Sequence, residues 1–295
     1  MKKTIYLVWL WLLVNACTTS ENWNIPPDAM FGHVKPVTIG GYDGDIMEPF
    51  LSRDGRFLFF NNSNARRENT NLHYAKFLND STFLYVAPLK NVNTDQLDAV
   101  ASMDTERRFY FTSSRSYAVT FSTLHHGIFE GGAVTDIQLV QGKLSPKKAP
   151  FLNMDAEISA DGQHLYFTIN EMNVIFGRPK TSDIQVAEKQ GDTFEILPDS
   201  DAIMQRINTD KLEYAPCTSA DELELFFTRA NLRTGQFKIL HARRATLDEP
   251  FGLPEVLIGS QGNIVEAPTI TPDGQTLYFH AKKNGKFRLF KMDRK

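Results

Sequence analysis

The stretch SADGQHLYF at residues 159–167 decides the fold, because four variants of it recur along the chain. They are SRDGRFLFF (52–60), SMDTERRFYF (102–111), SADELELFF (219–227) and TPDGQTLYF (271–279). Their aspartates lie about 50 to 60 residues apart. Self-similarity with a period of this size is the signature of a repeat architecture, so each copy is expected to form one structural unit.

Each copy predicts a hairpin followed by a buried strand. Asp-Gly between two apolar runs favours a tight turn, because glycine tolerates a positive φ angle. Thr105 and Glu222 replace this glycine in the second and fourth copies, so we expect those two turns to use another geometry. The Leu/Phe-Tyr/Phe-Phe triplet that follows each turn suits a strand buried on both faces.

Two further strands complete each unit. The third strands are expected at residues 71–76, 123–128, 173–178, 238–243 and 288–293, and a fourth strand follows, as at 254–259. Four strands in about 50 residues are typical of a β-propeller blade. The fifth copy lacks its fourth strand, and KPVTIG (35–40) resembles PEVLIG (254–259). We therefore predict an all-β fold of five four-stranded blades closed by an N-terminal strand, with six blades as the alternative.

The repeat resembles a known family. Ser-x-Asp-Gly-x-x-Leu-Tyr-Phe, preceded by Glu48-Pro49 or by Glu266-Ala267-Pro268, is similar to the WD-like repeat of TolB-type propellers over residues 34–295. TolB-like propellers usually have six blades, which is the source of the six-bladed alternative. The resemblance implies an envelope protein that binds proteins, peptides or glycans, although some propeller relatives are enzymes.

The N-terminus predicts export and lipidation. Lys2 and Lys3 precede an apolar run from Ile5 to Val14, and the small residue Ala16 precedes Cys17. This pattern is typical of a lipoprotein signal peptide. We predict a signal peptide at 1–16, a lipidated Cys17 and tether at 17–32, and the propeller at 33–295. The predicted location is the bacterial cell envelope, on the periplasmic side of the outer membrane.

Composition excludes some classes of function. The formal net charge of −3 gives no basic footprint for nucleic acid. Cys217 is the only cysteine besides Cys17, so no disulfide framework is expected and Cys217 is predicted to be a buried thiol.

One acid precedes the inner strand of every copy, and these acids are the candidate site. The Ser-x-Asp turns occupy one end of the channel, which we call the turn face; inner strands begin at the opposite end, which we call the funnel face. The candidate ligand-binding residues on the funnel face are Glu48, Asp98, Asp155, Glu213, Glu266, Arg115, Arg229 and His280. Such a ring would suit a divalent cation or a basic peptide. The favoured alternative is that each acid caps its own blade.

The other histidines favour a structural role. His73, His125, His126 and His241 align with apolar residues of the third strands, so they are expected to be half-buried strand residues. Sequence motifs for zinc proteases, phosphate loops and serine hydrolases are absent.

These patterns predict a monomeric, membrane-anchored binding or scaffolding module for an envelope protein, a peptide or a glycan. No cofactor is predicted. The alternative is a glycan-active hydrolase or lyase that uses two of the acids at the channel mouth. We favour the binding module over the enzyme, and no catalytic residue is assigned.

Overall fold

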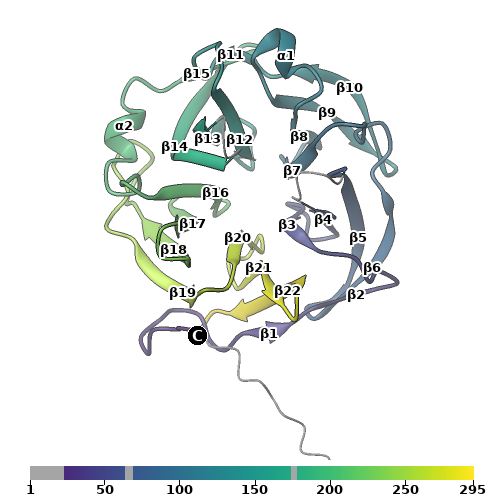
Figure 1. Cartoon of the computed structure of the whole chain (residues 1–295), viewed down its shortest axis with the longest axis vertical. Helices are drawn as coiled ribbons and strands as arrows, with labels where there is room; N and C mark the ends of the chain where they lie inside the picture. Colours follow the sequence, from purple (N-terminus) through teal and green to yellow (C-terminus); the bar gives the residue numbers. More distant parts are fainter. Residues whose placement is uncertain (1–22, 64–68, 174–177) are drawn as a thin grey trace, which may run out of the picture.

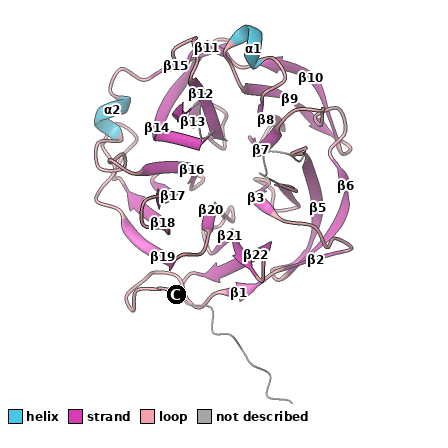
Figure 2. Cartoon of the chain, in the orientation of Figure 1, coloured by secondary structure: helices cyan, strands magenta, loops and turns pink. Residues whose placement is uncertain are grey.

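The computed structural model describes residues 23–63, 69–173 and 178–295. Five blades surround a central channel, so the five-bladed prediction is confirmed and the six-bladed alternative is wrong (Figure 1). Almost all regular structure is β-strand (Figure 2). The predicted signal peptide and Cys17 lie outside the described residues.

The blades are named A to E, and the strands of each are named in order from the channel outward. Blade A contains β3 (Met47–Leu51), β4 (Phe57–Asn61), β5 (Leu72–Asn79), β6 (Thr82–Pro88) and β2 (Thr38–Gly40). Blade B contains β7 (Asp98–Met103), β8 (Arg108–Ser113), β9 (Leu124–Glu130) and β10 (Ala133–Leu139). Blade C contains β12 (Phe151–Ile158), β13 (His164–Asn173), β14 (Arg178–Gln190), β15 (Thr193–Ile196) and β11 (Gln141–Lys143).

Blade D contains β16 (Leu212–Thr218), β17 (Glu224–Asn231), β18 (Gln236–Arg243) and β19 (Glu255–Gln261). Blade E contains β20 (Val265–Ile270), β21 (Thr276–Lys283), β22 (Lys286–Asp293) and β1 (Lys35–Pro36). The short helices α1 (Tyr117–Thr120) and α2 (Ser200–Ile203) lie in the connections to blade B's third strand and blade D's first. Among the described residues, no helix is long and apolar enough to cross a membrane.

The N-terminal segment closes the ring, as predicted, and it does so on two blades. Lys35 and Pro36 pair antiparallel with Lys291 and Phe290 of blade E. Residues 38–40 then pair parallel with β6 on the outer edge of blade A. The segment 35–40 therefore joins the last blade to the first and protects the edges of both sheets.

The described part of the predicted tether, residues 23–32, packs against the propeller. The Trp23 ring contacts Phe279 and Phe290 edge-on, at centroid distances of 6.3 and 5.5 Å. Asn24 exchanges two backbone hydrogen bonds with Gly259, and Phe31 is fully buried. The physical reason is apolar burial: these aromatic rings pack against Phe226 of β17, Phe279 of β21 and Phe290 of β22 in blades D and E.

Aromatic packing between neighbouring blades forms the core. The triplet strands are buried in every blade, and Phe59 of blade A contacts Phe109 and Phe129 of blade B at 5.0 Å. Two predictions about buried groups are confirmed: Cys217 is a buried free thiol, and the third-strand histidines lie in β5, β9 and β18, buried or half-buried.

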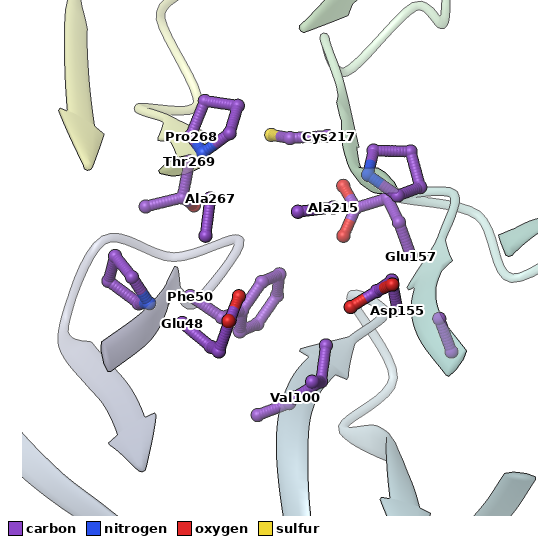
Figure 3. A pocket seen from close by; sticks show the side chains of 14 residues that line it. Glu48, Phe50, Val100, Asp155, Glu157, Ala215, Cys217, Ala267, Pro268 and Thr269 are labelled. Carbon is purple, nitrogen blue, oxygen red and sulfur yellow. The ribbon is translucent and has the colours of Figure 1, made fainter. Parts of the chain in front are cut away.

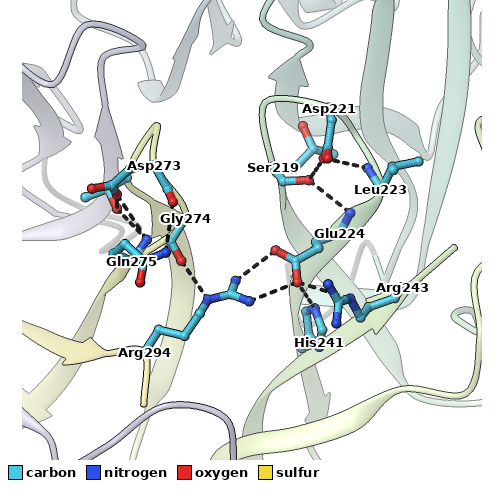
Figure 4. Close-up of polar contacts among 12 residues, drawn as sticks. Ser219, Asp221, Leu223, Glu224, His241, Arg243, Asp273, Gly274, Gln275 and Arg294 are labelled. Atoms are coloured by element: carbon cyan, nitrogen blue, oxygen red, sulfur yellow. Dashed lines mark hydrogen bonds and ion pairs between the residues drawn. The ribbon is translucent and has the colours of Figure 1, made fainter. Parts of the chain in front are cut away.

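The Ser-x-Asp turns are held by side-chain hydrogen bonds, as predicted. In blade D, the Ser219 hydroxyl donates to Asp221 at 2.6 Å, and the Leu223 amide donates to the same carboxylate at 3.1 Å. Figure 4 shows this turn beside the equivalent turn at Asp273 in blade E. Arg294 links the two blades because its guanidinium donates to Gly274 O and to both carboxylate oxygens of Glu224.

All five turns share one left-handed position, so the prediction of another geometry for two of them is wrong. Three residues after the first turn residue, φ is +70° at Gly55, +57° at Glu222 and +66° at Arg107. In blade B the turn begins at Asp104, which takes the place of the serine and accepts the Arg108 amide at 2.8 Å. At Glu222 the cost of the positive φ is offset by the side chain, which accepts a hydrogen bond from the Tyr166 hydroxyl at 2.8 Å.

We predict that Arg107→Gly raises the free energy of unfolding by about 0.5–1 kcal/mol, because glycine removes the cost of the left-handed conformation at this exposed turn. Gly55→Ala is the matched opposite, since an added Cβ meets nothing within 4 Å there. It should lower stability by about 1 kcal/mol. Urea unfolding of both variants measures this; equal stabilities would contradict a shared geometry.

Candidate functional site

Each inner strand carries a bulge near the funnel face. The ladder register shifts in β3, β7, β12, β16 and β20. A non-glycine residue with positive φ lies at each shift: Glu48, Val100, Asp155, Ala215 and Ala267. A bulge turns the local side chain and leaves one amide outside the ladder. Two side chains aimed by these bulges, those of Glu48 and Asp155, are acidic.

The amide freed by the bulge bonds to the neighbouring blade. The Val100 amide donates to Asn61 Oδ1 at 3.4 Å, and the Ala267 amide donates to Thr228 Oγ1 at 2.9 Å. The Glu48 amide donates to His280 Nδ1 at 3.1 Å. Asn61, Thr228 and His280 each follow the aromatic triplet of their own repeat. These three equivalent positions therefore supply acceptors between blades.

This contact fixes the state of His280. Because Nδ1 accepts the Glu48 amide, the ring proton is on Nε2, which donates to Glu266 Oε1 at 3.1 Å. The other carboxylate oxygen of Glu266 accepts the Tyr214 hydroxyl. Burial, and then the Glu266 charge, raise the pKa of Tyr214 well above its usual range. His280, predicted to bind a ligand from an exposed rim, is instead fully buried.

Asp155 is a buried acid with a raised pKa. Burial is the main cause and the Glu266 charge adds to it, while hydrogen bonds from Thr168 Oγ1 (3.1 Å) and the Ala215 amide oppose it. The resulting pKa is about 6, against an ordinary value of 3.8. Near neutral pH this carboxyl is therefore partly protonated, which is the state that a general acid requires.

Glu48 and Asp155 both line the channel cavity. Figure 3 shows their carboxylates pointing into the channel from different walls, and Phe50 and Glu157 line the same cavity. The space between them is about 30 Å³, which suits a water molecule or a small ion. A sugar ring does not fit in this space, so a glycan would meet these carboxylates at the funnel-face end.

Asp98 and Glu213, the acids of blades B and D, form ion pairs with the two predicted arginines. Arg115 Nη2 lies 2.7 Å from Asp98 Oδ1, and Arg229 Nε lies 2.6 Å from Glu213 Oε1. Both carboxylates are fully buried. The capping interpretation is confirmed for these two acids, because their oxygens are engaged within their own blades.

A repeated loop motif, absent from the sequence-based predictions, explains these pairs. VNTDQLD (92–98) and INTDKLE (207–213) have the same pattern. Each threonine donates its amide and hydroxyl to the acid four residues later, at 2.6 to 3.0 Å. Each asparagine, Asn93 or Asn208, exchanges two hydrogen bonds with the backbone of the preceding blade, at Leu72 or Ile184. Comparison of the two loops would have revealed this motif.

Arg53 and Glu157 close the channel toward the turn face. Arg53 Nη2 donates to Glu157 Oε1 at 2.8 Å, and Ser102 Oγ donates to Oε2 at 2.8 Å. The Thr218 amide adds a third donor at 3.2 Å. Donors from blades A, B and D thus converge on this one carboxylate of blade C. Neither Arg53 nor Glu157 was a predicted site residue.

A cation site at Glu48, Glu266 and His280 has suitable residue types, because their donor atoms lie within 4.8 Å of one another. The hydrogen bonds do not favour it. His280 uses both ring nitrogens and Glu266 uses both oxygens, so a metal would have to displace at least one of these contacts. The donor set as arranged does not fit a metal ion.

The five acids predicted to form one ring of equivalent residues therefore occupy three different positions relative to the bulge. Relative to the bulge, Glu48 and Asp155 occupy the bulged residue itself, Glu266 lies one residue before it, and Asp98 and Glu213 lie two before it. Strand alternation separates these positions by face. The structure brings Glu48, Asp155 and Glu266 together at the channel and directs Asp98 and Glu213 into loop contacts.

No protein-family model and no curated protein matches the chain. Among solved structures, it is similar to the endo-arabinase of Bacteroides thetaiotaomicron, with 13% identity and a TM-score of 0.53 over 88% of this chain and 98% of that one. It is also similar to the α-L-arabinofuranosidase PaAbf62A of Podospora anserina, solved with cellotriose: 12% identity, TM-score 0.55, coverage 92% and 98%. At these identities the likeness shows the propeller fold.

TolB from Acinetobacter baumannii is a further structural neighbour, with 12% identity over 85% of this chain and 55% of that chain. Its TM-score of 0.45 is too low to support a closer relationship. The class that fold and site define is a five-bladed β-propeller with carboxylates in its channel.

We predict that Asp155→Asn becomes more stabilising as pH rises. The native pKa of about 6 exceeds the ordinary 3.8, so the wild type loses stability between about pH 4 and 6 as the buried carboxyl ionises. The variant lacks this loss, and its stability relative to wild type should gain about 2–3 kcal/mol by pH 8. Urea unfolding from pH 4 to 8 measures it.

Asp161→Asn is the control of opposite sign. Burial raises the pKa of Asp161, but hydrogen bonds from Ser159 and Gln163 more than offset this and lower it. That variant should lose stability relative to wild type only as pH rises to about 5, where the carboxyl is ionised in both states, and the difference should be flat from about pH 5 to 8. Parallel pH profiles for the two variants would contradict the assigned environments.

Proposed function

We propose that this protein is a glycan-active hydrolase that acts at the funnel-face mouth of the propeller channel. Asp155 would donate a proton to the glycosidic oxygen, and Glu48 would serve as the second carboxylate, as base or nucleophile. Burial would keep the pKa of Asp155 raised, and the charge of Glu266, which is held by Tyr214 and His280, would add to it. A covalent or water-mediated route is not assigned.

One observation carries this proposal: two carboxylates, those of Glu48 and Asp155, line the same channel cavity, and Asp155 has a pKa of about 6. Glycoside hydrolysis uses one protonated and one ionised carboxyl group at the same bond. The solved propellers of similar fold include an endo-arabinase and an α-L-arabinofuranosidase, so the fold is compatible with glycan chemistry. This support is fold-level analogy.

The test is a hydrolysis screen of the full-length protein against neutral and acidic polysaccharides, with products separated by anion-exchange chromatography. Asp155→Asn and Glu48→Gln should each lower kcat/KM about 10²–10⁴-fold, as expected for the loss of proton transfer. The rate should fall above about pH 6, where Asp155 loses its proton. Asp161→Asn, on the turn face, should retain activity. No turnover, or equal loss in all three variants, would reject the proposal.

A binding module without turnover is the second candidate. Two observations favour it. Asp98, Glu213 and Glu266 already bond to other groups of the protein, and the channel space is only about 30 Å³. Such a propeller would bind an envelope protein, a peptide or a glycan on the funnel face. Ligand binding that survives Asp155→Asn, without product formation, would favour this candidate.

We also propose that the protein is a monomeric envelope lipoprotein, anchored through lipid at Cys17 on the periplasmic side of the outer membrane. The support is the sequence of residues 1–17. Residues 23–32 pack against blades D and E, so they leave a short connection, and an anchor at Cys17 would hold this side of the propeller close to the membrane.

We predict that Cys17→Ala moves the protein from the membrane fraction to the soluble fraction, because the acyl chains that supply the membrane affinity are lost. Metabolic labelling with palmitate should mark the wild type and not Cys17→Ala. Cys217→Ala is the matched control and should stay in the membrane fraction, since Cys217 is buried in the propeller. Unchanged fractionation of Cys17→Ala would contradict lipid anchoring.

A further inference from the structure

A groove of about 240 Å³ lies between blades C and D on the funnel face. One wall is formed by the end of β13 and the start of β14, and the other by the turn between β17 and β18. In Figure 1 the strands β14 and β16 that flank it are neighbours. Its lining includes the buried apolar residues Leu212 and Ala230 and the exposed Leu232. None of the sequence-predicted site residues lines this groove.

The groove is cationic. Four basic side chains line it: Arg178, Lys180, Lys211 and Arg233. Two acids oppose them. Asp210 is in the lining and lies 2.5 Å from Lys211, while Glu171 lies 2.9 Å from Lys180. Four positive charges and two negative charges leave a net +2. Within the described part of the chain, the Arg233 guanidinium makes no ion pair.

The groove lies next to the proposed site along β16, because Leu212 of its lining and Ala215 of the channel cavity are on this strand. Leu212 is followed directly by Glu213 and then by Tyr214, whose hydroxyl bonds to Glu266. Two residues of strand cover about 7 Å. A chain-like ligand lying in the groove would therefore reach toward the carboxylates at the channel mouth.

We propose that this groove binds an anionic saccharide, with its acidic groups on the basic walls and a sugar face on Leu232, the exposed apolar side chain of the lining. Arg suits carboxylate and sulfate groups because its donors form a planar fork. This inference rests on the proposed function and names its substrate class: an acidic oligosaccharide rather than a neutral one.

The experiment is calorimetric titration of the full-length protein carrying Asp155→Asn, which prevents turnover. The probes are a galacturonate pentasaccharide, a sulfated oligosaccharide and a neutral galactan pentasaccharide. We expect the acidic probes to bind at least tenfold more tightly than the neutral one, with affinity falling as salt rises. Arg233→Gln should weaken acidic binding several-fold, and Arg233→Glu more than tenfold. The preferred acidic probe distinguishes carboxylate from sulfate recognition.

Lys76→Glu is the matched control, because it reverses one exposed charge on β5 of blade A. It should leave acidic binding unchanged. Tighter binding of the neutral probe, or equal effects of Lys76→Glu and Arg233→Glu, would overturn the proposal that the groove binds acidic saccharides. A polyglutamate peptide that binds as tightly as the galacturonate would overturn the saccharide assignment.

Failure of this inference is distinguishable from failure of the proposed function. Hydrolysis of a neutral glycan at a rate that Arg233→Glu does not change would support the proposed hydrolase activity and reject the proposed acidic substrate. Arg233-dependent binding of galacturonate, with no product from the protein with Asp155 intact, would support the groove and reject the hydrolase.

Discussion

The hydrogen bond between a bulged amide and the next blade is the contact on which the rest of this propeller depends. The bulge releases an amide from its own ladder, and a buried amide needs an acceptor. Asn61, Thr228 and His280 supply it from the preceding blade. The same backbone turn aims Glu48 and Asp155 into the channel. Ring closure and the candidate site therefore follow from one local irregularity, repeated five times.

Charge is distributed along the channel in a way that separates structural from candidate functional carboxylates. Toward the turn face, Glu157 accepts donors from three other blades, which compensates its burial. In the loops, Asp98 and Glu213 are compensated by arginine and threonine. Asp155 receives neutral donors and faces the charge of Glu266. It is a buried acid whose environment disfavours its own ionised form.

The fold could be predicted because five copies of one phrase report the same strand order, and the segment 35–40 supplies the missing edge. The site could be predicted only in part. Counting from the turn aspartates placed five acids in one ring, but Asp104 occupies the serine position of its turn. In addition, Glu48 is itself the bulged residue, whereas Glu266 and Glu213 lie one and two residues before the bulged residue of their strands. A one-residue shift in a strand moves a side chain to the other face, and periodicity alone does not reveal it.

Glu224 and Asp155 show how the two kinds of carboxylate differ in energy. His241, and then Arg294, lower the pKa of Glu224 to about 2, so its ionised form stabilises the fold at neutral pH. The pKa of Asp155 is raised to about 6, so its ionised form destabilises the same fold. Stability of the fold therefore does not explain an ionisable carboxyl group at position 155. Local inconsistency of this kind is expected at functional sites, and in this protein it falls on the channel wall opposite Glu48.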